Sequence, residues 1–481
     1  MRTTKVFRDP VHGYINVPID YCSNFIDDTI FQRLRHIEQT SIRALYPAAR
    51  HDRFIHSLGV MHLGIKAFEY LQKNTLAYKK FPKISEEKWR TWEQSFRIAC
   101  LLHDCGHAPF SHTFEKYYKR HNSLEVTLAT LCGHPDQAAL LSSAAPHEKM
   151  SAILVMTHYK DRIDKLVPTA DIELIVRMIT GWRYPTRDTD ERKIEGCLIE
   201  LLNGTAIDVD KLDYIMRDTW ASGFVNASID IDRLFASITL ENSQGGNLVI
   251  AYAKPALNVL SSVLLARNYL YQWVYYHHKV LYDQWLLLQA VETVPRSLYD
   301  MDNESFEKLM FSIDIFSTPQ KIGEESFWMP CDGDLIHLIK RSAKSKVGNE
   351  YADEWLSRGH KRKSMWKSFA EYCIIFEDLP LDHMESLDNE KLQGVVKTAL
   401  DALDLDENAA MILPSKPKLA QFTADNVFIK LQNKTIPFSK LPEIGNNSQN
   451  NVPAFFYLYF DRDIISKKAL IEQIFTEYSK T

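Results

Sequence analysis

The segment Phe96–Cys105 is apolar almost throughout until it reaches a histidine–aspartate pair. An apolar run of this kind is typical of a helix buried inside a bundle. Gly106 and Pro109 follow and predict that the helix ends there in a turn. Nine of the 17 histidines lie between His51 and His147, in a region with the pattern of successive helices. We therefore expect a histidine-rich helical core.

The composition is that of an average soluble chain. Of 481 residues, 57 are Lys or Arg and 62 are Asp or Glu, which gives a formal charge of −5, and 45% are apolar. These proportions argue against a disordered, collagen-like or coiled-coil protein. An isoelectric point near 6.4 argues against a nucleic-acid partner that needs one broad basic face. The basic stretch 358–363 fits a solvated face better than a nucleic-acid contact.

Targeting and membrane-spanning patterns are missing from the sequence. The first residues, Met1–Phe7, lack the apolar run of a signal peptide, and no stretch of about 18 uninterrupted apolar residues follows. The seven cysteines are odd in number and form no Cys-x-x-Cys pair, which is typical of reduced, mostly buried thiols. We therefore expect a cytoplasmic protein without a membrane partner.

Strand patterns appear in the second half of the chain. The runs Ser237–Leu240 and Asn247–Tyr252 flank a glycine-containing turn and predict a β-hairpin. No Gly or Pro interrupts the sequence from Ala256 to Val294, which predicts one long or slightly broken helix. We expect a mainly α fold, with a large helical domain at 1–300 and a smaller mixed α/β region at 301–481 for regulation or oligomerisation. Within that region we predict a linker at 404–416, a hairpin at 426–431 and 435–438, and a strand at 454–460.

A candidate metal site begins where the buried run ends. His103 and His107 lie four residues apart, on one face of a continuing helix, with Asp104 beside them. Imidazole and carboxylate groups are natural ligands of a first-row divalent metal. A His-Asp pair alone is more often part of a buried structural contact, so the other ligands have to come from distant segments.

Two distant segments offer such ligands. Arg53 and His56 are three residues apart and share one helical face. The segment 208–214 carries three acids and a lysine in a short, largely helical span. Asp208 and Asp210 cannot face the same way on a helix, so only one of them is expected to reach a metal. The alternative for each acid is a helix N-cap or a surface charge.

The order of these residues resembles a known signature. His56, then His103-Asp104, then Asp210 is similar to the H…HD…D pattern of the HD-domain metal phosphohydrolases. Several flanking motifs resemble more closely the deoxynucleoside triphosphate triphosphohydrolase branch, which includes bacterial dGTPase-like enzymes and the human sterile-alpha-motif/HD triphosphohydrolase. The resemblance covers roughly residues 5 to 290 and implies an HD-domain helical bundle. Its motifs are Asp9-Pro-Val-His-Gly, Phe31–Gln39, Arg53–Val60, His103–His112 and Asp208–Tyr214.

The resemblance implies roles for the metal-binding and catalytic residues. A divalent ion, Mg, Mn, Fe or Zn, would be held by His56, His103, Asp104 and Asp210. Arg53 would touch the α-phosphate, and His107, His112 and His147 would line the phosphate chamber. His112 would donate a proton to the leaving 5′ oxygen, with Glu115 behind it, where relatives carry Asp. Such chemistry suits a histidine because its side chain titrates near neutral pH.

The resemblance also implies a substrate pocket. Gln39 would read the sugar 3′ hydroxyl, although relatives often continue Gln-Leu-Gly where this chain has Gln39-Thr-Ser. The remaining substrate contacts would be Lys211, Tyr214, Asp218, Arg267 and Tyr275.

A nucleotide effector site between subunits is implied for some members of the family. The matching positions here are Lys5, Asp28, Gln32 and Arg35, with Lys254 as a neighbour. The alternative is that these residues are surface charges and helix caps. An effector site would predict a dimer or tetramer whose activity on one nucleotide rises when another is added.

Three hypotheses about function follow. The first is a metal-dependent enzyme that hydrolyses deoxynucleoside triphosphates to deoxynucleoside and inorganic triphosphate. The second is another HD phosphohydrolase, such as a nucleotide phosphatase or a cyclic-dinucleotide phosphodiesterase; the latter class normally shows a Gly-Tyr-Pro motif, which this chain lacks. The third is a regulatory protein that senses nucleotides without turnover.

Overall fold

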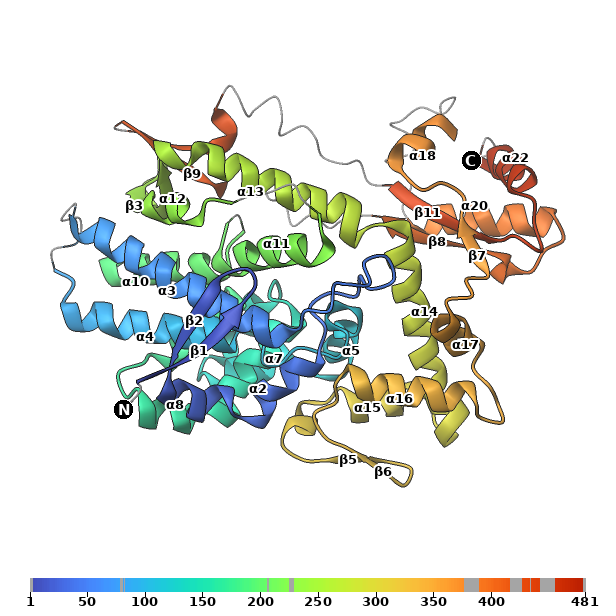
Figure 1. Ribbon diagram of the computed structural model, residues 1–481, viewed down its shortest axis with the longest axis horizontal. Coiled ribbons are helices and arrows are strands. Elements are labelled where there is room, and N and C mark those ends of the chain that lie inside the picture. Colours follow the sequence, from blue (N-terminus) through green and yellow to red (C-terminus); the bar gives the residue numbers. More distant parts are fainter. Residues whose placement is uncertain are drawn as a thin grey trace. The chain divides into compact units, whose positions relative to one another are not determined.

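The computed structural model describes residues 3–77, 81, 83–205, 207–224, 229–375, 389–415, 426–432, 434–441 and 455–478 (Figure 1). The chain forms two compact units, and each is discontinuous in sequence. The first holds residues 1–270, 299–337 and 421–449, and the second holds 271–298, 338–420 and 450–481. This division differs from the single boundary expected at residue 300, because two later segments return to the first unit.

The first unit is mainly helical, as the sequence predicts, and helices α3 and α4 form its centre. The Ser85 side chain caps α4 by accepting the Lys88 N–H, and large buried side chains such as Trp92 and Phe96 then fill the space beside α3. The elements of this unit are β1 (Thr4–Asp9), β2 (Gly13–Pro18), α1 (Ile19–Tyr21), α2 (Thr29–Arg33), α3 (Arg53–Ala77), α4 (Glu86–Leu102), α5 (Glu115–His121), α6 (Leu124–Leu131), α7 (Pro146–Leu154), α8 (Lys160–Leu166), α9 (Ile172–Thr180), α10 (Asp190–Leu202), α11 (Val209–Ser222), α12 (Ile231–Ala236), β3 (Ile238–Asn242), β4 (Leu248–Ala253), α13 (Leu257–Tyr269), α15 (Asn303–Met310), β5 (Gln320–Ile322), β6 (Glu325–Phe327), β9 (Phe428–Leu431) and β10 (Lys434–Pro437).

Helix α4 ends earlier than the sequence predicts. It stops at Leu102, and residues 103–106 form turns instead of a further helical turn. The expectation that His103 and His107 share a helix face is therefore wrong. The turn passes close to α7 at Gly106, where a Cβ would lie 2.5 Å from the Ser151 backbone nitrogen, so this position requires glycine.

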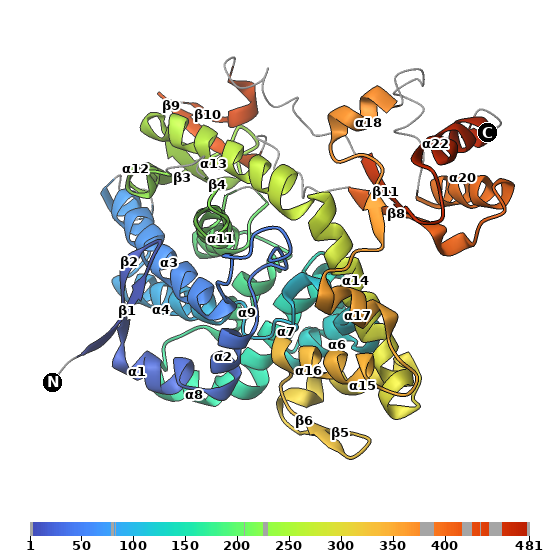
Figure 2. The ribbon, with the colours of Figure 1, turned by 45° about the vertical axis from the view of Figure 1, so that its right-hand side comes forward.

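A small sheet joins two distant parts of the first unit. The predicted hairpin β3–β4 is confirmed, and so is the hairpin β9–β10. The strand order is β10-β9-β4-β3, and β9 pairs parallel to β4 (Figure 2). A segment more than 170 residues later in the sequence therefore completes the sheet that β3 and β4 begin.

The second unit packs helices against a three-stranded antiparallel sheet. The strand order is β7-β11-β8, and the predicted strand at 454–460 is confirmed as β11. The predicted linker at 404–416 is wrong, because β8 lies there and pairs with β11. The elements are α14 (His278–Val294), α17 (Glu350–Ser357), β7 (Arg362–Ser364), α18 (Phe369–Ile375), α20 (Asn389–Ala402), β8 (Ala410–Ser415), β11 (Phe455–Asp461) and α22 (Lys467–Tyr478), while α16 (Asp332–Ala343) spans the boundary between the units.

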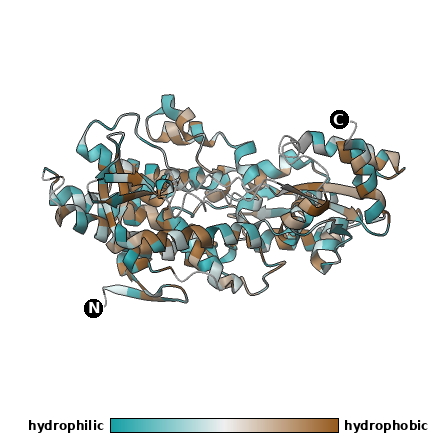
Figure 3. Cartoon of the chain, turned by 90° about the horizontal axis from the view of Figure 1, so that it is seen from above, coloured by the Kyte–Doolittle hydropathy of each residue, from teal (hydrophilic) through white to brown (hydrophobic). Residues whose placement is uncertain are grey.

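The uninterrupted stretch 256–294 is a broken helix, one of the two forms that the sequence predicts. It contains α13, a π-helical segment at Leu270–Tyr275, and α14. Along the chain, helices carry apolar and polar residues side by side, as amphipathic helices do (Figure 3). In the described part of the chain, no helix combines the length and the apolar character needed to cross a membrane.

Candidate metal and catalytic site

Four predicted metal ligands converge from three helix ends of the first unit. His56 lies in the first turn of α3, His103 and Asp104 directly follow α4, and Asp210 lies in the first turn of α11. Asp210 Oδ1 lies 3.0 Å from His56 Nε2 and 3.7 Å from His103 Nε2. Asp104 Oδ2 lies 3.6 Å from His56 Nε2, and Asp104 Oδ1 lies 3.6 Å from His103 Nε2. The structure thus brings together all four residues.

The two imidazoles point the same nitrogen into this group. His56 Nδ1 lies 2.7 Å from an Asp213 carboxylate oxygen, and His103 Nδ1 lies 2.9 Å from the Cys100 carbonyl oxygen. Carboxylates and carbonyls only accept, so Nδ1 carries the proton in both rings and Nε2 is available as a metal ligand. Among the described residues, His103 Nε2 is buried without a hydrogen-bond partner. The donor set therefore fits a divalent metal ion.

Burial and charge oppose one another at these ligands. Burial disfavours the charged form of Asp104, but Arg53 and the neighbouring histidines hold its pKa far below the usual value. The pKa of Asp210 is likewise lowered against burial, by its contacts with His103 and His56. Burial also opposes the charge on His56, whose pKa is nevertheless raised to about 9 by Asp210 and Asp213. The charged form of His56 thus offsets the ionised carboxylates, and a metal cation bound at this place would displace that proton.

A second group, three histidines and one glutamate, lies beside the first. Glu115 is the first residue of α5, and its Oε1 contacts His147 Nδ1 and lies 3.2 Å from His112 Nδ1. The same oxygen lies 3.5 Å from His107 Nε2. His107 stacks on His147 with ring centroids 4.2 Å apart. These are the four residues that the resemblance placed around the phosphates.

The members of this second group differ in charge and exposure. Burial lowers the pKa of His107 well below its usual value, so the ring is neutral, and neither ring nitrogen has a hydrogen-bond partner among the described residues. Burial opposes protonation of His147, but Glu115 raises its pKa to about 9. The His112 side chain is 64% exposed. His112 is therefore the member of the group that is open to a molecule arriving from solvent.

Asp104 and Arg53 lie where the two groups meet. Asp104 Oδ1 is 3.9 Å from His147 Nε2, and its other oxygen accepts a 2.6 Å hydrogen bond from Arg53 Nη1. Arg53 also donates to Ser111 Oγ and to the Gln39 carbonyl. The guanidinium is thus held at the metal-ligand group by three acceptors from different segments.

The turn before His112 has a strained backbone. Phe110 and Ser111 both adopt left-handed conformations, with φ of +51° and +53°, which cost free energy in non-glycine residues. Asp332 holds this turn by accepting the Phe110 N–H at 2.6 Å and the Glu38 N–H at 2.8 Å. Ser111 Oγ also donates to the Glu38 carbonyl. The surrounding contacts therefore enforce the position of His112.

The predicted substrate-binding residues differ in their surroundings. Asp208 caps α11 and binds the Lys211 ammonium, so Asp210 alone of these two acids reaches the metal ligands. Burial opposes the charge on Lys211, but Asp208 and Asp210 raise its pKa, against a smaller opposing effect of the Arg267 charge. Gln39 is buried, and its Oε1 has no hydrogen-bond partner in the part of the chain that the structure describes.

The other predicted substrate residues lie on two elements. Asp218 is buried in α11 and lies 2.6 Å from His51 Nε2, a partner that the sequence did not predict. Tyr214 is half-buried on the same helix. Tyr275 ends the π-helical segment and belongs to the second unit.

The predicted effector residues form local contacts. Asp28 caps α2, and its pKa is lowered, against the effect of burial, by His158, Arg162 and Tyr159. Gln32 Nε2 donates to the Ile26 carbonyl, and Arg35 donates to Gln32 Oε1. Lys5 lies 3.7 Å from Asp27, and Lys254 lies in a 3-10 turn after β4.

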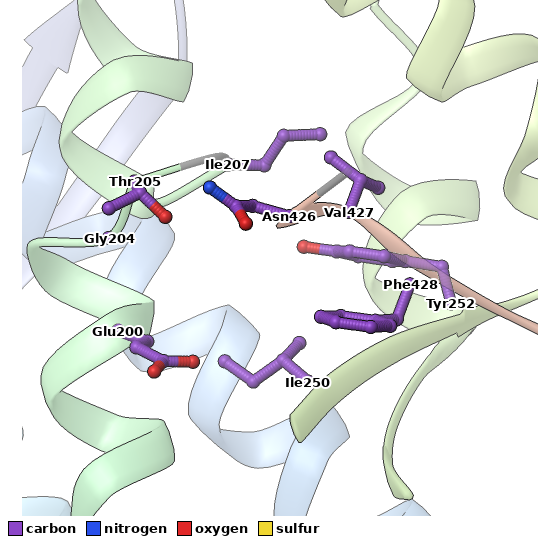
Figure 4. A pocket seen from close by; sticks show the side chains of 9 residues that line it. All are labelled: Glu200, Gly204, Thr205, Ile207, Ile250, Tyr252, Asn426, Val427 and Phe428. Atoms are coloured by element: carbon purple, nitrogen blue, oxygen red, sulfur yellow. The ribbon is translucent and has the colours of Figure 1, made fainter. Parts of the chain in front are cut away.

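A small cavity lies beside the loop that leads to Asp208. Glu200, Thr205, Tyr252 and Asn426 line it together with apolar side chains of β4 and β9 (Figure 4). Its volume of about 40 Å³ suits a few water molecules but not a nucleotide.

Comparisons with known proteins agree with this geometry. Residues 53–193 match the model of the HD domain. A deoxynucleoside triphosphate triphosphohydrolase SAMHD1 homolog from Dictyostelium discoideum is 32% identical over 226 residues, 46% of this chain and 37% of that protein. The SAMHD1 protein of Danio rerio is 29% identical over 287 residues, 57% of this chain and 42% of its own length.

Two further proteins have no assigned activity. An uncharacterized protein from Methanocaldococcus jannaschii is 30% identical over 288 residues, 60% of this chain and 49% of that protein. The chain thus spans about half or less of the length of these curated relatives. A crystal structure of a hypothetical protein from Aquifex aeolicus shares the fold over 99% of this chain and 100% of its own, with a TM-score of 0.62 and 20% identity. Residues 53–193 thus carry an HD domain, and the chain is similar over about half its length to relatives named deoxynucleoside triphosphate triphosphohydrolases.

Proposed function

We propose that this protein hydrolyses deoxynucleoside triphosphates to deoxynucleoside and inorganic triphosphate in a metal-dependent reaction. One observation carries the proposal: Asp104 lies between the metal-ligand group and the Glu115–histidine group, within 3.9 Å of His147 on one side and 3.6 Å of His56 and His103 on the other. A phosphoryl group in contact with both groups would have an activating cation on one side and a proton donor on the other. The names of the relatives supply the nucleotide class.

The residues of the chain have separate tasks in this reaction. A divalent metal held by His56, His103, Asp104 and Asp210 would polarise a phosphoryl oxygen and lower the pKa of water. Water adds to the α-phosphorus and loses a proton to solvent. The bond from phosphorus to the 5′ oxygen breaks, the deoxynucleoside is the leaving group, and the three phosphates are released together as inorganic triphosphate.

The exposed His112 gives a proton to the departing 5′ oxygen. Glu115 holds His112 by Nδ1, which leaves the other ring nitrogen free to face the substrate. The neutral His107 can donate its ring N–H to a phosphate oxygen without adding a buried charge. Because the bond to the 5′ oxygen is the one that breaks, the products are a deoxynucleoside and inorganic triphosphate.

A triphosphate needs compensating positive charge, and the first unit supplies it locally. Arg53 at the metal ligands, protonated His147, and Lys211 close to Arg267 form the candidate set. The overall charge of −5 does not oppose this, because electrostatic stabilisation depends on groups fixed at the site.

The test is product analysis with the full-length protein. The Mn²⁺-loaded protein is incubated with each deoxynucleoside triphosphate, alone and in every pair, and anion-exchange chromatography separates triphosphate, diphosphate and orthophosphate. We expect triphosphate and deoxynucleoside in equal amounts, lost in His103→Asn. His134→Asn is the control, because His134 is a half-buried histidine outside both groups and is also close to a carboxylate, Glu173 at 3.3 Å.

Other products, or none, would refute the proposed reaction and indicate one of two alternative functions. Orthophosphate, diphosphate or a nucleoside monophosphate would identify another HD phosphohydrolase. Binding of nucleotides without any product would identify a sensing protein.

We further propose that a nucleotide effector acts near Asp28, Gln32 and Arg35, and that the protein forms a dimer or tetramer with the effector bound. The contacts that support this join all three residues to one short segment, α2. The expected result is a rise in activity on one deoxynucleotide when a second is added, together with a larger mass in light scattering. A monomer whose activity ignores added nucleotides would end this proposal.

A further inference from the structure

The N-terminal motif Asp9-Pro-Val-His-Gly forms the tight turn between β1 and β2. Asp9 Oδ1 accepts the N–H groups of Val11 and His12 at 2.7 Å each. Gly13 has φ +77°, a conformation that strongly favours glycine. The turn therefore fixes the Asp9 and His12 side chains on one side of the hairpin, and the proposed reaction uses neither of them.

His12 reaches the metal ligand His56 through one carboxylate. Its Nε2 lies 2.6 Å from Asp213 Oδ1, and the other oxygen of Asp213 lies 2.7 Å from His56 Nδ1. The side chains of His12, Asp213 and His56 are 6%, 0% and 1% exposed. A carboxylate that binds the far nitrogen of a ligating histidine fixes the direction of the ligand nitrogen.

Arg217 closes the network on the side of Asp9. It donates to both oxygens of Asp213, at 2.8 and 2.9 Å, and to Asp9 Oδ2 at 2.7 Å. Asp213 and Arg217 lie one turn apart on α11, and both are buried. The Asp213 carboxylate is therefore held by the hairpin through His12 and by its own helix through Arg217.

Gly59 makes room for this carboxylate between α3 and α11. A Cβ at position 59 would lie 2.0 Å from Asp213 Oδ1 and 2.5 Å from Arg217 Nη2. Gly59 lies one turn after His56 on the same face of α3. The close approach of the two helices at this point is what allows Asp213 to reach both histidines.

We propose that the β1–β2 hairpin positions the metal ligand His56: His12 and Arg217 hold Asp213, and Asp213 directs His56 Nε2 toward Asp104 and Asp210. His12 touches no proposed ligand or substrate, so it is a positioning residue. The inference rests on the metal site of the proposed function, but not on the substrate. It predicts that metal affinity falls when the hairpin loses its contact with Asp213.

The test measures Mn²⁺ affinity of the full-length protein by electron paramagnetic resonance of free Mn²⁺. We expect His12→Phe to weaken binding by about 10- to 100-fold, the usual range for loss of such a partner. His12→Gln keeps an N–H that can reach Asp213, and it should recover most of the affinity. His121→Phe is the matched control, because His121 is also buried and lies 2.6 Å from a carboxylate, Glu307, which is neither a proposed ligand nor the partner of one.

The outcomes separate positioning from general destabilisation. Melting temperatures of all variants are measured with and without Mn²⁺. Wild-type affinity in folded His12→Phe, or an equal loss of affinity in His121→Phe, would overturn the inference. If His12→Phe does not fold, Asp9→Asn weakens the hold on Arg217 and should lower the affinity severalfold; unchanged affinity there would overturn it too.

The same assays distinguish this inference from the proposed function. A wild-type protein that binds Mn²⁺ but releases no triphosphate would refute the proposed reaction and leave the inference standing. Unchanged Mn²⁺ affinity in His12→Phe, with triphosphate release intact, would refute the inference and leave the proposed reaction standing. A wild-type protein without Mn²⁺ binding would overturn both.

Discussion

Replacing Gly59 with alanine should destabilise the first unit even though alanine is the better helix former. The new Cβ would lie 2.0 Å from Asp213 Oδ1, whereas ordinary contacts begin at 3.4 Å. The carboxylate would therefore have to retreat by about 1.4 Å. Its 2.6 Å contact with His12 and its 2.9 Å bond with Arg217 cannot survive such a shift.

The magnitude follows from two opposing effects. Breaking a buried ion pair typically costs about 3–5 kcal/mol, and replacing a helical glycine by alanine returns about 1 kcal/mol. The net loss in the free energy of unfolding is therefore about 2–4 kcal/mol. For a unit of about 340 residues, with an unfolding entropy of about 2.1 cal/mol/K per residue, that corresponds to a fall of roughly 3–6 °C in the melting temperature.

Thermal unfolding followed by circular dichroism measures this effect, and Gly394→Ala is the control. Gly394 is exposed in α20, and no atom lies within 4 Å of the place that a Cβ would take there, so alanine at this position should stabilise by up to about 1 kcal/mol. A Gly59→Ala variant as stable as the wild type would refute the packing argument, because the carboxylate would then have room that the structure denies it.

Three further perturbations have defined outcomes. Burial raises the pKa of Asp283 from 3.8 to about 6. Between these pH values the folded state binds more protons than the unfolded state, so the stability of the wild type falls as pH rises through 6. In urea titrations, Asp283→Asn should match the stability of the wild type near pH 4 and exceed it by about 2 kcal/mol at pH 7. A stability difference independent of pH would contradict that assignment. Glu115→Gln should lower kcat for triphosphate release by about 100-fold with KM nearly unchanged, because it removes the charge that orients His112 and His147; a change in KM alone would assign Glu115 to binding. Chelation should abolish hydrolysis and lower the melting temperature, since a ligand at 100 times its Kd adds about 2.7 kcal/mol, and Mn²⁺ should restore both; full activity in the chelator would exclude a metal requirement.

Local patterns identify several elements correctly. The hairpin β3–β4 is predictable because a glycine-containing turn separates two apolar runs, and turn chemistry acts within a few residues. The grouping of His56, His103, Asp104 and Asp210 is predictable for a different reason, because their order matches a family signature. Asp208 can be expected to cap α11 from its residue type alone.

Contacts between distant segments are not predictable in the same way. The sequence does not show that His12 and Asp213, 201 positions apart, share a hydrogen bond. It does not predict β1–β2 either, because only five of the twelve residues in these two strands are apolar. Asp332 is another example. Nothing in the sequence around it indicates that its carboxylate accepts the Glu38 and Phe110 N–H groups. Strand β8 resembles a linker in sequence because its partner β11 lies 40 residues later. Only the signal of a shared motif marks Asp9 and His12 as unusual.

The parallel pairing of β9 with β4 constrains how the chain folds during synthesis. The strand that completes the sheet begins at Phe428, and Asp332 joins the turn before His112. A ribosome releases residues in order, so most of the helical unit emerges well before either segment is available. The sheet of the first unit therefore stays incomplete, with one edge of β4 unpaired, until most of the second unit has been translated. Expression of residues 1–300 alone would leave that edge exposed to pairing with other chains.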